Sequence, residues 1–219
     1  MNSNLKELAL SYAQERGWPV FPCNPKNKRP LIKGGHTKAS LDLAVIAEWW
    51  TKYPGAMIGM PTGAASGVWV LDIDAPEEFE AAAITLPPTL RAQTGKGYHL
   101  YWSSDPAVRN KQKAQGDWPF QCLPGAEVRG EGGYVILPGS PHPSGKHYKW
   151  ANDNEVAKAP SKLLEIVTAL NSRPKTPKAP IHTHSGSDTP YGLKALEGEC
   201  QAIERAANGE QESALNTAS

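Results

Sequence analysis

Apolar residues recur along the chain with two different periods, and each period predicts a different kind of element. Residues 4–16 place apolar side chains three or four positions apart, which predicts a helix capped by Asn4. A second helix is expected to start at a Ser40 cap, to bury Trp50 and to stop before the Pro–Gly pair at 54–55. Both helices have one apolar face, which we expect to pack against the core.

Shorter apolar runs, bounded by Gly and Pro, predict β-strands. They fall in the stretches 18–23, 56–63, 67–74, 90–102, 126–140 and 146–151. The stretches 90–102 and 126–140 each have the form strand, glycine turn, strand. Short helices are expected within 76–84 and from a Ser161 cap to about residue 170. Because no regular βαβ period appears, the pattern predicts an α+β domain rather than a doubly wound sheet.

The chain changes character after residue 171. Residues 172–190 are rich in Pro, Ser and Thr and hold almost no large apolar side chain, which predicts a flexible linker. Residues 191–219 have helical spacing but are too few to enclose a core alone. We therefore expect one domain at 1–171, a linker, and the beginning of a helical C-terminal region that this chain cuts short.

Charge and cysteine content narrow the class of protein. The 219 residues carry a formal net charge of +1, which argues against a protein that is basic all over. Basic clusters remain at 24–38 and at Arg109, Lys111 and Lys113, and each can be a nucleic-acid contact or solvated loop charge. No apolar run predicts a membrane span and no secretory signal is evident. The three cysteines form no CxxC pair, so we expect a reduced cytoplasmic protein without a zinc site.

Two carboxylates, Asp72 and Asp74, end the apolar stretch GVWVLDID. Strands ordinarily avoid Asp, and a buried charge without a partner is costly. Because side chains alternate along a strand, both carboxylates should share a face, about 7 Å apart at Cα. They can clamp a divalent cation such as Mg²⁺. The alternative is that they only begin a turn.

A glycine turn leads into a strand in the stretch TGKGYHLYW, residues 94–102. It is not a P-loop, because the position five residues before the Gly–Lys pair is Leu90 rather than Gly. The backbone amides of Gly95 and Gly97, together with the ring of His99, can donate to a phosphate. The alternative is that His99 is an ordinary core or surface histidine.

A third polar pattern lies in AEVRGEGGYVILPGS, residues 126–140. Glu127 and Arg129 share one face of the expected strand. Glu127 can be a third metal carboxylate, and Arg129 can bind a phosphate bidentately. The alternative is an ordinary Glu–Arg surface pair, which contributes little stability.

Taken together and in order, these stretches resemble the bifunctional primase–polymerase (prim-pol) family of the archaeo-eukaryotic primase superfamily. WVLDID is similar to the family's hhDhD strand, and TGKGYHLYW to its glycine-rich turn followed by His. EVRGEGGYVILPGS is similar to the acidic residue that precedes RGxGGYVxxP and Ser. The resemblance covers roughly residues 5–170. It implies a primase-like fold, with an RRM-like mixed sheet and flanking helices.

The resemblance also implies the chemistry of nucleotidyl transfer, in which a 3′-hydroxyl attacks the α-phosphate of a nucleotide and pyrophosphate leaves. Asp72, Asp74 and Glu127 would hold two divalent ions, Mg²⁺ or Mn²⁺. The third acidic residue of the family is typically Asp, so Glu127 is a departure. His99 would be catalytic, and His99 and Arg129 would neutralise the triphosphate. Further phosphate contacts are expected from Thr94, Lys96 and Ser140. Lys33 and His36 in the basic loop are expected to contact either the triphosphate or the template.

The hypothesis from the sequence is a DNA primase–polymerase that makes and extends primers on single-stranded DNA from nucleoside triphosphates. The C-terminal piece resembles the start of a helical domain that follows prim-pol domains in plasmid, phage and integrated-element replication proteins, often before a helicase. One alternative is a non-catalytic nucleotide- or nucleic-acid-binding module of a replication protein. Another is a metal-dependent phosphohydrolase that uses the same carboxylates.

Overall fold

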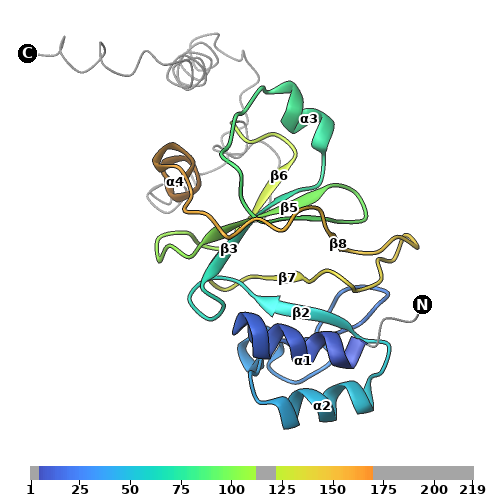
Figure 1. Cartoon of the computed structure of the whole chain (residues 1–219). Coiled ribbons are helices and arrows are strands. Elements are labelled where there is room, and N and C mark those ends of the chain that lie inside the picture. Colours follow the sequence, from blue (N-terminus) through green and yellow to red (C-terminus); the bar gives the residue numbers. More distant parts are fainter. Residues whose placement is uncertain (1–4, 112–121, 170–219) are drawn as a thin grey trace, which may run out of the picture. The chain divides into compact units, whose positions relative to one another are not determined.

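Two small antiparallel sheets form the framework of the protein (Figure 1). The structure is a computed structural model and describes residues 5–111 and 122–169. The first sheet has the order β1-β2-β7 and contains β1 (Phe21–Cys23), β2 (Met57–Pro61) and β7 (Tyr134–Ile136). The second sheet has the order β6-β3-β5-β4-β8. Its strands are β3 (Val68–Ile73), β4 (Arg91–Gln93), β5 (Tyr98–Ser103), β6 (Ala126–Arg129) and β8 (Lys149–Trp150).

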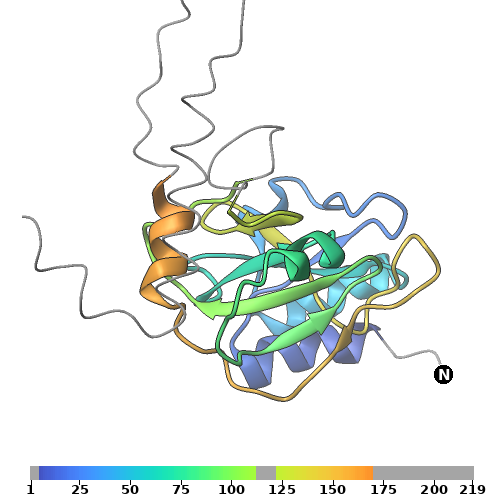
Figure 2. The ribbon, with the colours of Figure 1, turned by 90° about the horizontal axis from the view of Figure 1, so that it is seen from above.

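Two amphipathic helices, α1 (Leu5–Arg16) and α2 (Leu43–Lys52), pack together beside the first sheet, and the second sheet lies on its other side (Figures 1 and 2). The N-cap of α2 is Asp42, whose carboxylate accepts from the amides of Ala44 and Val45. We expected Ser40 in this role, and that prediction is wrong. Ser40 is still extended, because its backbone pairs with Val20.

Three shorter helices complete the described chain. They are the 3₁₀ helix η1 (Gly35–Lys38), α3 (Pro76–Ala81) and α4 (Ser161–Thr168). Pro76 occupies the first turn of α3, as its fixed φ predicts. Ser161 is the first helical residue of α4 rather than its cap, since Pro160 holds the N-cap position. The expected Asn4 cap, the linker 172–190 and the helical region 191–219 lie outside the described residues.

The stretch 126–140 does not form the hairpin that its pattern suggests. β6 pairs with β3 in the second sheet, whereas β7 pairs with β2 in the first. The glycine-rich segment between β6 and β7 therefore carries the chain from one sheet to the other. Backbone hydrogen bonds join Glu131 in this segment to Val108 and Asn110. This crossing places the two sheets around a shared pocket.

All pairs between the described strands are antiparallel, where we expected a mixed sheet. Antiparallel strands can be joined by a short turn, as β4 and β5 are, whereas parallel neighbours need a long crossover connection. The main apolar core joins α1, α2 and both sheets. Trp18 stacks on Tyr101 of β5 at 5.8 Å between ring centroids, which ties the N-terminal segment to the second sheet. Within the described ranges, no helix combines the length and apolarity needed to cross a membrane.

Candidate active site

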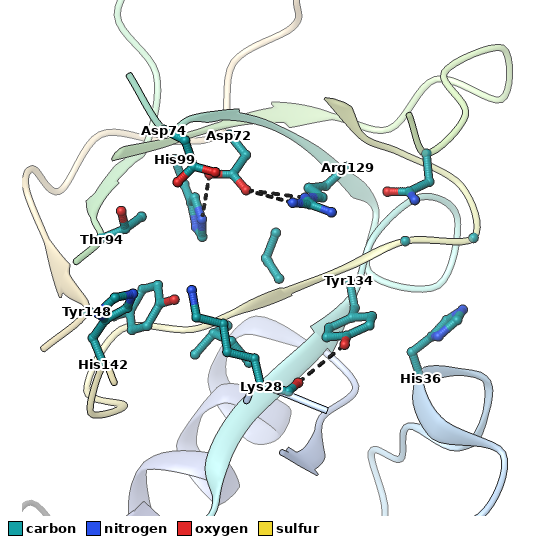
Figure 3. A pocket seen from close by; sticks show the side chains of 15 residues that line it. Lys28, His36, Asp72, Asp74, Thr94, His99, Arg129, Tyr134, His142 and Tyr148 are labelled. Carbon is teal, nitrogen blue, oxygen red and sulfur yellow. Dashed lines mark hydrogen bonds and ion pairs between the residues drawn. The ribbon is translucent and has the colours of Figure 1, made fainter. Parts of the chain in front are cut away.

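A pocket lies between the two sheets, where β3 ends and the chain crosses from β6 to β7 (Figure 3). Its walls combine carboxylates, cationic groups and aromatic rings. The residues labelled in Figure 3 are Lys28, His36, Asp72, Asp74, Thr94, His99, Arg129, Tyr134, His142 and Tyr148. This composition suits a charged ligand better than an apolar one.

Strand register brings the acidic groups together. Asp72 in β3 is the pairing partner of Glu127 in β6 and of His99 in β5, so the three residues form one row across the sheet. Asp74 follows the end of β3, two residues beyond Asp72 and on the same face. One carboxylate oxygen from each of Asp72, Asp74 and Glu127 lies within 4.8 Å of the others. Three such oxygen donors are a suitable ligand set for Mg²⁺ or Mn²⁺.

Asp72 is the buried member of this group and contacts the side chains of His99 and Arg129. Its Oδ1 lies 3.3 Å from Nε2 of His99, and its Oδ2 accepts from Nε and Nη2 of Arg129, each at 3.2 Å. Burial raises the pKa of Asp72, but the charge and hydrogen bond of His99, followed by those of Arg129, lower that pKa to about 2. Asp72 is therefore a carboxylate at neutral pH.

The sequence of the whole domain agrees with this geometry. The family model described as the N-terminal domain of bifunctional DNA primase/polymerase matches residues 9–162. The chain belongs to the Prim-Pol family. This confirms the family predicted from the three motifs, and all the strands and the pocket fall within the matched range. Among curated proteins, no significant match to the chain was found.

Arg129 lies among the carboxylates of the Prim-Pol site. Its Nη2 donates both to Glu127 Oε2 and to Asp72 Oδ2, so the Glu–Arg pair that the sequence left as an alternative does form. It is not a surface pair, because Asp72 is buried and Arg129 is only 18% exposed at its side chain. The guanidinium offsets the repulsion that three close carboxylates would otherwise have.

Replacing Arg129 by Gln should strengthen binding of Mn²⁺ in the absence of nucleotide. The arginine competes with a cation for Asp72 and Glu127, so its removal leaves the carboxylates a better metal site, by about fivefold in affinity. Titration of the protein with Mn²⁺, followed by electron paramagnetic resonance, measures this. Arg109→Gln, an exposed arginine, is the matched control. Unchanged or weaker Mn²⁺ binding in Arg129→Gln would contradict this competition.

Acid should destabilise the fold through Asp72. Its pKa of about 2 in the folded protein lies below the ordinary 3.8, so the unfolded chain takes up the proton first as the pH falls. This contribution, about 2 kcal/mol, is fully present above about pH 4 and is lost as the pH falls through 2. Urea unfolding of the wild type and of Asp72→Asn between pH 2 and pH 6, without metal, measures it. If the free energy of unfolding changes with pH in the same way in both proteins, Asp72 is not the source of this acid sensitivity.

Thr94 lines the pocket and organises the turn before β5. Its Oγ1 accepts from the amides of Lys96 and Gly97, at 3.2 and 3.0 Å. The Gly97 amide is therefore engaged within the turn, and our expectation that it is free for a phosphate is wrong. Gly95 lies against the ring of His142, where a Cβ atom would overlap the imidazole.

The other predicted nucleotide contacts divide between the pocket and the surface. His36 lines the pocket and stacks on Tyr134, with 5.7 Å between ring centroids. Lys33 and Lys96 are exposed and do not line the pocket. Ser140 is fully buried, and its Oγ accepts from the Ile58 amide at 2.9 Å. Its hydroxyl thus supports the first sheet, and the structure gives no basis for the nucleotide contact expected of it.

Several pocket residues were not singled out by the sequence. Lys28 was one of five basic residues in a loop, with nothing local to distinguish it. His142 and Tyr148 lie beyond the third motif, and Tyr134 was read only as part of a strand. The sequence HPSG at 142–145 is typical of a turn and could have drawn attention to His142. In the structure this turn does fix the ring, since the Ser144 amide donates to Nδ1 of His142 at 3.1 Å.

Proposed function

We propose that this protein is a DNA primase–polymerase that makes and extends primers by nucleotidyl transfer on single-stranded DNA. The observation that carries the proposal is the convergence of Asp72, Asp74 and Glu127 beside His99 in a Prim-Pol chain. The three carboxylates would hold two divalent ions, Mg²⁺ or Mn²⁺. When bound, such ions activate the attacking 3′-hydroxyl and stabilise charge on the transferred phosphate.

The remaining side chains of this site bind and orient. His99 fixes the orientation of Asp72 through the contact at Oδ1. Arg129 is positioned to turn from the carboxylates to the phosphates of a bound nucleotide, where its planar donors fit two oxygens. His36 and the ring of Tyr134 offer a flat surface for the nucleoside. The Tyr134 hydroxyl donates to the Lys28 carbonyl at 3.3 Å, which holds that ring in place.

We further propose that the second sheet is RRM-like. Its strand order β6-β3-β5-β4 is the order of a split βαβ arrangement, with α3 between β3 and β4. The division into a catalytic domain at 1–171, a linker at 172–190 and a helical region from 191 is part of the same proposal. So is a role in replication of a plasmid, phage or integrated element, with a helical domain and a helicase as partners. The domain division, the role in replication and these partners rest on the motif resemblance alone.

Synthesis on single-stranded DNA tests the function. The full chain is incubated with a template, ribo- or deoxyribonucleoside triphosphates and Mg²⁺ or Mn²⁺, and the expected result is template-dependent product longer than a dinucleotide. Metal-dependent nucleotide binding without product would instead indicate a binding module. Release of phosphate from nucleotides without any template would indicate a phosphohydrolase.

A further inference from the structure

Lys28 brings a positive charge into the pocket. It lies in the loop between β1 and η1, is half-buried, and places Nζ 5.7 Å from the centroid of the Tyr148 ring. Among residues 5–111 and 122–169, no carboxylate or hydrogen-bond acceptor pairs with this ammonium. Burial lowers the pKa of Lys28, and Asp72 and Asp74 only partly offset this. A half-buried ammonium that has neither a hydrogen bond nor an ion pair among the described residues points to an anionic ligand.

The backbone of the loop fixes the position of Lys28. Its φ is +63°, in the left-handed region that L-residues other than Asn and Asp rarely adopt. The Lys28 amide donates to the Asn24 carbonyl at 2.8 Å, and its own carbonyl accepts from Tyr134. Lys26, two residues earlier in the same loop, is exposed. The loop therefore turns one specific lysine inward.

The two ends of the pocket, on either side of Lys28, differ in their side chains. On one side of Lys28 lie Tyr148 and His142, and on the other side lie Tyr134 and His36 (Figure 3). Nδ1 of His142 lies 3.1 Å from the Ser144 amide and 2.7 Å from the Ser144 hydroxyl, so the turn at 142–145 holds this ring in place. Burial, followed by the charges of Lys28 and Lys96, lowers the pKa of His142, and Asp74 partly offsets this. The β- and γ-phosphates fit the end of the pocket at Tyr148 and His142. The nucleoside fits the opposite end, at Tyr134 and His36.

We propose that Lys28 binds the pyrophosphate portion of the incoming nucleotide and protonates it as it leaves. The proposal rests on the proposed nucleotidyl transfer. In that step the 3′-oxygen bonds to the α-phosphorus, and the bond from that phosphorus to the bridging oxygen breaks. The electron pair stays on the bridging oxygen, which takes a proton from the Nζ ammonium. The proton of the 3′-hydroxyl goes to solvent, and neutral Nζ regains one from water.

The proton donor and the positive charge can be separated by substitution. Lys28→Arg keeps the charge, but a guanidinium does not give up a proton at accessible pH. Lys28→Met removes the charge and keeps the length of the side chain. Lys26→Arg and Lys26→Met are the matched controls in the same loop. Each protein is assayed for nucleotide affinity with Mn²⁺ and for the rate of a single nucleotide addition.

For Lys28→Arg we expect nucleotide affinity within about threefold of wild type and a rate of addition about 100-fold lower. For Lys28→Met we expect both quantities to fall, and for the Lys26 variants neither. Analogues with a more acidic β,γ-bisphosphonate leaving group should restore much of the Lys28→Arg rate, because a better leaving group needs less protonation. Such rescue is not expected for a merely structural residue.

The outcomes separate this proposal from the proposed function. If wild type synthesises DNA and Lys28→Arg does so at the same rate, Lys28 is not the proton donor. Equal slowing of all analogues in Lys28→Arg would also overturn the role. If wild type binds nucleotide but adds none to any primer, both proposals fail together.

Discussion

Replacing Asp72 and Asp74 together by Ala should abolish primer synthesis, with the rate falling by about 1,000-fold or more. The two carboxylates supply most of the charge that would hold the divalent ions, and the loss of several kcal/mol of transition-state stabilisation converts to that factor. The measurement is product formed on single-stranded DNA with Mg²⁺ and with Mn²⁺. Asp153→Ala, at an exposed aspartate outside the pocket, should synthesise like wild type.

The fold of the double variant has to be checked, because Asp72 is buried and paired with His99 and Arg129. The melting temperature of the double variant measures this. Asp74→Ala alone tests the site without disturbing the buried pairs, since Asp74 is exposed and its removal should leave the melting temperature unchanged. It should still lower synthesis strongly. Full synthesis by a folded double variant would contradict the role of these carboxylates.

The second large effect concerns Gly97, at the turn before β5. A Cβ atom here would overlap the carbonyl oxygen of Ile73, the last residue of β3, and would crowd the ring of Pro76. Gly97→Ala should therefore push the end of β3 outward and destabilise the fold by about 2–3 kcal/mol. For a domain of this size that is a fall of roughly 5–10 °C in melting temperature.

Gly55→Ala is the matched control for Gly97→Ala, because no neighbouring atom lies within 4 Å of a Cβ at Gly55. Both proteins are followed by thermal unfolding and by synthesis. Gly97→Ala should lose synthesis even below its melting temperature, because the end of β3 carries Asp72 and leads into Asp74. An unchanged melting temperature would show that β3 and the glycine turn are not packed as described.

Much of the acidic site could be predicted because its residues lie within short sequence motifs, each on a single strand. The alternation of side chains along one strand was enough to place Asp72 and Asp74 on one face. The resemblance to the prim-pol motifs then implied that Glu127 and His99 would join them. The structure explains this success, since Glu127, Asp72 and His99 are paired residues on three adjacent strands.

The rest of the pocket could not be predicted because it depends on contacts between distant segments. Lys28 lines the same pocket as Asp72 only because the loop after β1 is held beside Tyr134 of β7 and Tyr148, which lie far away in the sequence. Ser140 shares a motif with Glu127, yet its hydroxyl bonds to Ile58 in the other sheet. Two residues of one motif thus diverge where the chain crosses between sheets, and the motif alone does not show that crossing.

The most direct test is a crystal structure of the full chain with Mn²⁺ and a non-hydrolysable nucleoside triphosphate. The account predicts anomalous manganese density bound by Asp72, Asp74 and Glu127, with Arg129 turned away from them and the β- and γ-phosphates against Lys28. Manganese and nucleotide bound elsewhere, with the three carboxylates still paired to Arg129 and His99, would contradict it.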